Sequence, residues 1–156
     1  MKVISDASPL IFLAKLEALN LVLHCFETVC IPLAVHEEIG DLILPPDIQL
    51  VKISPLSRHF VNGAVGHLHR GELEAMVLAQ EIQADYVLLD DLAARRKAKR
   101  FGLGMIGTVG IIQLAYQANY ISSTVASNYL DKLVQQHGLY LSTTIFDKLK
   151  KQWQPD

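Results

Sequence analysis

The sequence predicts an α/β protein: a three-layer α/β/α fold with a central parallel sheet and a helical C-terminal third. Strand-like and helix-like segments alternate over the first two thirds of the 156 residues, which is the pattern of a parallel sheet with helical crossovers. The first strand turns at once into a helix, and only helical patterns follow residue 108. A chain of this length fits one domain, so we expect a single domain 1–156, with a core at 1–125 and a C-terminal helical extension at 126–156.

The first strand contains β-branched Val3 and Ile4, and Pro9 is well tolerated in the first turn of the helix that follows. Asp6 therefore lies where the strand becomes a helix. In an open α/β sheet this is the edge where ligands bind, because the carboxyl ends of the strands border a crevice.

The remaining elements are predicted from apolar periodicity, β-branched residues and breaks at proline or glycine. In chain order we expect a helix pair within 10–23 broken at Asn20, a strand at 27–32, a helix at 33–40, a short strand at 48–53, a helix at 72–83, an apolar strand at 84–89, a basic helix at 92–101, a short strand at 102–108, a helix to 119 with Thr108 as its N-cap, a helix to 137 capped by Ser123 or Thr124, and a final helix at 145–152. The polar segment 54–71 lacks such a pattern, so we expect a mobile segment that covers part of the ligand-binding edge.

The composition excludes several classes of protein. With 51% hydrophobic and 19% charged residues, the chain is neither disordered nor fibrous. No apolar run approaches the roughly 18 residues that span a bilayer, and the first strand leaves no room for a signal peptide. We therefore expect a soluble cytoplasmic protein. Cys25 and Cys30 match no zinc or redox spacing, which favours small buried hydrophobic side chains.

Four acidic residues are predicted to face one crevice. Asp6 and Asp91 follow strands, and Glu38 and Glu72 lie on helices that pack beside them. One pair of carboxylates ~4 Å apart repels by about 4 kcal/mol at an effective dielectric of 20, so such a cluster normally needs a cation. Oxygen ligands favour Mg²⁺ or Mn²⁺ over zinc.

Several segments resemble the motifs of the PIN-domain family, and of its VapC-like toxin ribonucleases in particular. They are ISDASPLI, IPLAVHEEI, GELEAMVLA, ADYVLLDD and GTVGI, which together span most of residues 1–125. In that family a strand-end aspartate, a helical glutamate, an acid that opens a helix and a second strand-end aspartate bind divalent metal for RNA cleavage.

By motif position, the resemblance implies that these ligands and catalytic residues are Asp6, Glu38, Glu72 and Asp91, with Ser8 at a small polar position. Many family members have aspartate in place of Glu72, and a Thr-x-Asp motif where this chain has Leu89-Asp90-Asp91, so Asp90 remains an alternative ligand. Because side chains alternate along a strand, we expect Asp91 to reach the metal and Asp90 to brace the neighbouring loop.

Each candidate has a simpler structural interpretation. Asp6 is a suitable helix cap, Glu38 a suitable solvated acid, and Glu72 a suitable complement to the helix dipole. We interpret Glu37 and Glu74 in this simpler way. His67 and His69 have no third ligand nearby, so we interpret them as polar loop residues rather than as a zinc site.

The basic helix is the candidate RNA-binding element. Arg95, Arg96, Lys99 and Arg100 recur at i, i+1, i+4 and i+5, which predicts one cationic face. Such a face suits phosphate contacts, which give affinity without sequence choice. The alternative is that these cations complement the dipole at the end of the helix.

The residues and the resemblance together predict a metal-dependent endoribonuclease that uses Mg²⁺ or Mn²⁺. The resemblance also implies a toxin neutralised by a small antitoxin, often as a homodimer. Two alternatives remain. A receiver-type signalling domain would need a lysine at the end of a later strand, where this chain has Ile106-Gly107-Thr108. A PIN fold that no longer cuts would act as an RNA-binding or partner-binding module.

Overall fold

The computed structural model describes residues 1–66 and 68–154. The described residues form a five-stranded sheet in the order β3-β2-β1-β4-β5, and every neighbouring pair is parallel. The strands are β1 (Lys2–Ser5), β2 (Thr28–Ile31), β3 (Ile48–Leu50), β4 (Tyr86–Leu88) and β5 (Met105–Ile106). The helices are α1 (Ala7–Lys15), α2 (Asn20–Cys25), α3 (Leu33–Ile39), α4 (Pro55–Ala64), α5 (Arg70–Glu81), α6 (Leu92–Arg100), α7 (Thr108–Gln117), α8 (Ser123–Gln135) and α9 (Thr143–Gln152).

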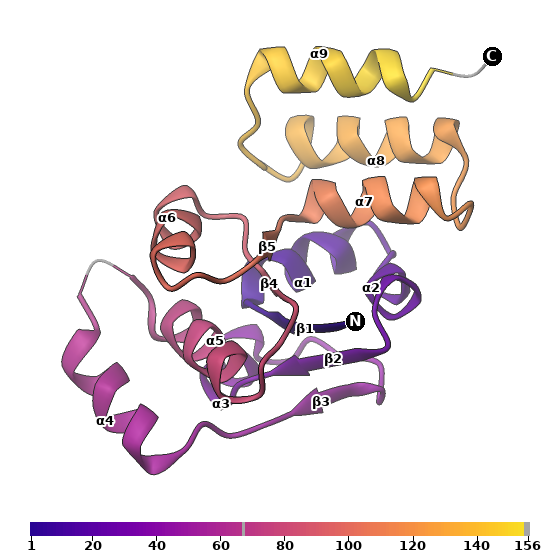
Figure 1. Cartoon of the computed structure of the whole chain (residues 1–156). Helices are drawn as coiled ribbons and strands as arrows, with labels where there is room; N and C mark the ends of the chain where they lie inside the picture. The colour runs from indigo at the N-terminus through magenta and orange to yellow at the C-terminus, as the bar shows by residue number, and fades with distance from the viewer. Residues whose placement is uncertain (67, 155–156) are drawn as a thin grey trace.

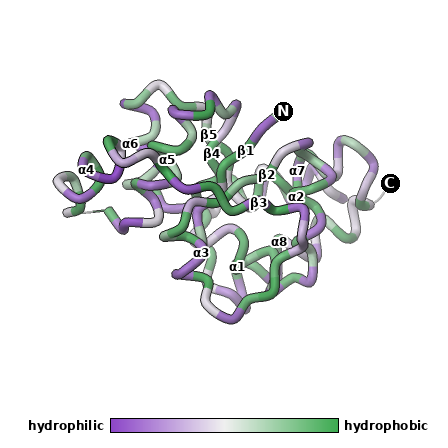
Figure 2. The backbone as a smooth tube through the Cα atoms, turned by 90° about the horizontal axis from the view of Figure 1, so that it is seen from below, coloured by the Kyte–Doolittle hydropathy of each residue, from purple (hydrophilic) through white to green (hydrophobic). Residues whose placement is uncertain are grey.

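The sheet is buried on both faces, which confirms the three-layer prediction. Along β1, Val3 packs into the core under α1, α2, α7 and α8, and Ile4 packs into the opposite core under α5 and α6. This alternation is the two-residue period of a strand. Figure 2 shows hydrophobic segments in the strands at the centre of the molecule, and α4 at its periphery.

β1 lies in the centre of the sheet and brings together residues far apart in the chain. It pairs with β2 through Val3 and Val29, and with β4 through Val3 and Tyr86. Directly after β1, the Asp6 N–H donates a hydrogen bond to the Leu88 carbonyl at 3.0 Å. The residues that follow β1 and β4 therefore meet at the same edge of the sheet.

The segment 54–66, part of the polar segment 54–71 that we expected to be mobile, is mainly helical. α4 has Ser54 as its N-cap, whose Oγ accepts a hydrogen bond from the Ser57 N–H at 3.1 Å, and Pro55 occupies the first turn. The helix buries only Val61, and the Phe60 ring packs edge-on against Phe101 at 6.4 Å between centroids. The segment is polar on average, which favours a loop, although its apolar residues do recur with helical spacing.

Two predicted helix caps were also wrong by one residue. Gly107, not Thr108, is the N-cap of α7, because the Thr108 hydroxyl donates a hydrogen bond to Asp90 Oδ2 instead. Ser122 is the N-cap of α8, and its Oγ accepts a hydrogen bond from the Val125 N–H at 3.2 Å. These shifts move the helix starts and leave the order of elements as predicted.

The C-terminal third is helical, as predicted, and α7, α8 and α9 stack as successive layers (Figure 1). Trp153 at the end of α9 is fully buried, and its Nε1–H donates a hydrogen bond to Gln113 Oε1 on α7 at 2.8 Å. Cys30 is buried, Cys25 is half-buried, and both are free thiols. In the described ranges, no helix combines the length and apolarity needed to cross a bilayer.

Candidate metal centre

Asp6 is a buried carboxylate without a complete set of partners. It occupies the N-cap position of α1 but makes no side-chain capping hydrogen bond. Only 4% of the residue is exposed, and within the described part of the chain its Oδ1 has no hydrogen-bond partner. Burial raises the pKa of Asp6 to about 7, and the neighbouring carboxylates Glu72, Glu38 and Asp90 also raise it. An unpaired buried oxygen is costly, so this atom needs a proton or a cation.

Glu38 on α3 approaches the same point from the solvent side. A Cβ atom on Gly71 would lie 2.7 Å from Glu38 Oε2 and 3.4 Å from Asp6 Oδ1. The two carboxylates thus converge on the first turn of α5 at a position where the chain has only a hydrogen atom. Gly71 is what leaves room between them.

Glu72, the next residue on α5, is 6% exposed, and its Oε2 accepts a hydrogen bond from the His69 N–H at 3.2 Å. Burial raises the pKa of Glu72, and the charges of Asp91 and Glu38 add to this rise. Glu72 therefore caps its own helix and also faces the other acids.

Glu74 turns away from these acids, on α5. It is buried, its Oε1 accepts a hydrogen bond from the Ala34 N–H at 3.2 Å, and its Oε2 lies 3.6 Å from Arg70 Nη1. The hydrogen bond from Ala34 holds α5 against α3, and the ion pair with Arg70 lies within α5. Glu74 is a structural acid that joins two helices.

Asp90 and Asp91 lie next to each other after β4 and have different partners. Asp90 is partly buried and accepts hydrogen bonds from the Thr108 N–H at 2.7 Å and the Thr108 hydroxyl at 2.6 Å. Burial raises the pKa of Asp90, although Thr108 and Arg95 act in the opposite direction. Asp91 is exposed, and its Oδ2 accepts a hydrogen bond from the Ala94 N–H at 2.9 Å as the N-cap of α6.

The acids face one another without forming a coordination cage. The charges of Glu38, Glu72 and Asp90 raise the pKa of Asp6, and the charge of Asp91 raises the pKa of Glu72. The five carboxylates are therefore close enough to interact electrostatically. Across residues 1–66 and 68–154, however, no three His, Cys, Asp or Glu side chains gather closely enough to hold a metal ion. Ser8 lies exposed on α1, two residues beyond Asp6.

The basic residues of α6 do not form the single face predicted for Arg95, Arg96, Lys99 and Arg100. Arg95 is half-buried, and its Nη1–H donates a hydrogen bond to the Leu89 carbonyl at 3.0 Å. Arg96 and Arg100 line a groove on another side of the helix, and Lys97 lines it with them. Lys99 is exposed and lies outside this groove. One residue along an α-helix rotates the side chain by about 100°, which separates Arg95 from Arg96.

Two residues at this edge were not predicted to have the roles that the structure gives them. Gly71 makes room for Asp6 and Glu38, and Thr108 holds Asp90 with its backbone and its hydroxyl. The sequence contains a signal for Gly71, because a glycine in the first turn of a long helix is costly unless something approaches it closely. Of the two histidines considered for zinc, His67 lies outside the described residues. His69 is the N-cap residue of α5.

The protein is an α/β protein with a parallel sheet, with acids at the carboxyl ends of its central strands and cations on the helix that follows β4, and this edge is where such sheets bind ligands. The chain belongs to the PIN-domain family: the family model DUF3368, a PIN domain, matches residues 2–155. This membership confirms the family that the motifs resemble. No curated protein and no protein of solved structure matches the chain significantly.

Proposed function

We propose that this PIN domain is a metal-dependent endoribonuclease that hydrolyses RNA phosphodiester bonds with Mg²⁺ or Mn²⁺. The observation that carries the proposal is the unpaired buried oxygen of Asp6, facing Glu38 across the space that Gly71 leaves open. Buried carboxylates with raised pKa values that gather at the edge of a sheet are typical of functional sites.

The donor set fits a hard divalent ion. Carboxylate oxygens without histidine or cysteine suit Mg²⁺ or Mn²⁺. In the proposal, Asp6, Glu38, Glu72 and Asp91 hold the ion, and Asp90 and Ser8 stand beside them. Asp91 uses one oxygen as a cap and has a second one, whereas both oxygens of Asp90 are already bound by Thr108.

The protein's own groups prepare the site for an anionic substrate. Thr108 fixes Asp90, and Arg95 fixes the end of β4 through the Leu89 carbonyl, so the edge is held from both sides. Exposed Arg96, Lys99 and Arg100 are placed to attract the phosphate backbone of RNA. The chemistry that the ion supplies when bound is Lewis-acid polarisation of the scissile phosphate and a water-derived nucleophile near neutral pH.

The test is cleavage of a labelled single-stranded RNA in Mg²⁺, in Mn²⁺ and in EDTA. Glu38→Gln should reduce the metal-dependent rate by at least about 100-fold, since even second-shell partners of a metal contribute 10–100-fold. The matched control is Glu37→Gln, the neighbouring exposed glutamate of α3, which should cleave within about twofold of wild type. Absence of cleavage by wild type in either metal would overturn the proposal in favour of the non-cutting module.

The toxin role, the small antitoxin and the homodimer belong to the same proposal and are supported by the resemblance to VapC-like proteins. If the role is correct, a small protein encoded beside this chain should form a stable complex with it. That complex should cleave RNA at least 10-fold more slowly than the free chain. Co-purification, sizing and a cleavage assay would test all three parts.

A further inference from the structure

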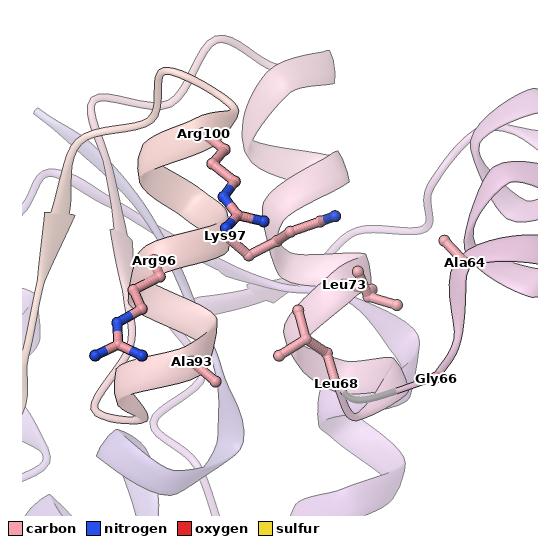
Figure 3. A pocket seen from close by; sticks show the side chains of 8 residues that line it. All are labelled: Ala64, Gly66, Leu68, Leu73, Ala93, Arg96, Lys97 and Arg100. Carbon is pink, nitrogen blue, oxygen red and sulfur yellow. The ribbon is translucent and has the colours of Figure 1, made fainter.

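The groove beside α6 has the chemistry of a nucleotide-binding site. It has a volume of about 340 Å³ and is lined by Ala64, Gly66, Leu68, Leu73, Ala93, Arg96, Lys97 and Arg100. Figure 3 shows the three cationic side chains on α6, with Lys97 extending towards α5, and Leu68, Leu73 and Ala64 on the other side. One side of the groove is therefore cationic and the other apolar.

The cations of this groove have no acidic partner in the described structure. None of the described lining residues is acidic. The ion pairs found among residues 1–66 and 68–154 involve Met1, Arg70 and Lys150, not Arg96, Lys97 or Arg100. Unneutralised cations in a concave site raise the local concentration of anions.

Two residues that line the groove lie close in sequence to acids of the candidate metal centre. Leu73 directly follows Glu72 on α5, and Ala93 lies two residues after Asp91. Ala93, Arg96, Lys97 and Arg100 are spaced i, i+3, i+4 and i+7, so they form one stripe along about 10 Å of helix.

We infer that this groove is a subsite for single-stranded RNA, in which Arg96, Lys97 and Arg100 bind backbone phosphates and the apolar side receives a nucleoside. A volume of about 340 Å³ is at the lower end for ligand sites, which suits one nucleotide rather than a duplex. Single-stranded RNA is recognised by phosphate contacts together with packing of unstacked bases. The inference rests on the proposed ribonuclease function. It adds that the bound RNA is single-stranded and that the residues which bind it include Lys97 and exclude Arg95.

The first experiment measures binding of a fluorescent single-stranded 12-nucleotide RNA by anisotropy, in EDTA so that no cleavage occurs. The variant R96Q/K97Q/R100Q should bind at least about 10-fold more weakly at low salt. The slope of log K against log salt should fall by about 2, because each phosphate contact contributes roughly 0.7. The charge-matched control K132Q/K148Q/K151Q changes exposed lysines on α8 and α9 and should bind within about twofold of wild type. Equal losses in the two variants would overturn the subsite.

A second variant fills the groove without changing charge. Ala93 is exposed, so Ala93→Phe should fold normally and fill the groove. We expect at least fivefold weaker RNA binding, and unchanged affinity would contradict the inference. A duplex of the same sequence should compete at least 10-fold less well than the single strand, and 10 mM inorganic phosphate should not displace the RNA. Equal competition by the duplex, or displacement by phosphate, would overturn the subsite.

The same measurements separate the two proposals. If wild type cleaves RNA in Mg²⁺ or Mn²⁺ while the groove variants bind as wild type does, the subsite is wrong and the ribonuclease proposal stands. If the groove variants lose RNA but wild type cleaves in neither metal, the subsite stands and the ribonuclease proposal is wrong.

Discussion

The ends of the neighbouring strands β1 and β4 each carry an inward-facing aspartate, and the two are held in opposite ways. Asp90 receives two hydrogen bonds from Thr108, whereas Oδ1 of the more deeply buried Asp6 receives none within the described residues. Both pKa values are raised by burial, but only that of Asp90 is opposed by a neighbouring cation, Arg95. A buried polar group with partners stabilises a fold, and one without partners is retained at a cost that function explains. The comparison supports the proposal that Asp90 braces the edge and that Asp6 is the ligand.

The strongest test of this comparison is Asp6→Asn. It removes a buried charge with little change in volume, so the metal-free protein should be at least as stable as wild type in urea unfolding. Metal-dependent RNA cleavage should fall by at least about 100-fold. Retained cleavage together with lower stability would give Asp6 the structural role that we assign to Asp90.

Gly71→Ala should also weaken function without lowering stability, but by less than Asp6→Asn. The added Cβ would lie 2.7 Å from Glu38 Oε2, the end of a flexible exposed side chain that can move away. We expect about 10-fold weaker Mn²⁺ binding by calorimetry. Because alanine favours a helix over glycine by up to about 1 kcal/mol, the stability without metal should not fall. Unchanged Mn²⁺ affinity would show that Asp6 and Glu38 do not share an ion.

Thr108→Val tests the other side of the comparison. It removes the hydroxyl that donates to Asp90 and keeps the shape of the side chain. The partly buried carboxylate loses a partner, so the free energy of unfolding should fall by about 1–3 kcal/mol. Metal affinity, measured by calorimetry, should change far less than in Asp6→Asn; a loss as large as in that variant would place Asp90 among the ligands.

The adjacent residues Asp90 and Asp91 give a finer test. Asp91→Asn should lower metal affinity and single-turnover cleavage together, with little loss of stability because asparagine is also a good N-cap. Asp90→Asn should have a smaller effect on both metal affinity and cleavage. The reverse order would make Asp90 the ligand and Asp91 only a helix cap.

The smallest expected effect concerns Glu81, a largely exposed acid with partners. Despite the opposing effect of desolvation, hydrogen bonds from Ser54 and Ser57 lower the pKa of Glu81, and the Ser54 N–H lies 3.0 Å from Oε1. A pKa lowered on folding stabilises the protein above the unfolded value near 4.5, and this contribution is lost as the pH falls through the folded pKa. Glu81→Gln should therefore melt slightly below wild type at pH 7, and the difference should disappear by about pH 3. A difference in melting temperature that does not change with pH would mean that the charge of Glu81 does not contribute to stability.

The sequence predicted the order of elements and the position of Asp6 because both depend on local pattern: β-branched residues followed by a charge and a helix start. It did not predict α4, because the polar residues of this segment and Gly63 outweighed the helical spacing of Leu56, Phe60 and Val61. The partners of Thr108 and Arg95 were also missed. Their contacts, to Asp90 and Leu89, depend on how β4, β5 and α6 pack together, which local pattern does not report.

The central position of β1 also affects how the protein is made. β1 leaves the ribosome first, but its partner β4 follows roughly 80 residues later, since Val3 pairs with Tyr86. At translation rates of about 5–20 residues per second, that interval lasts about 4–16 s. During it, Asp6 has neither its hydrogen bond to Leu88 nor the acids that follow β4. The nascent chain therefore cannot assemble the acidic edge until more than half of it has been synthesised.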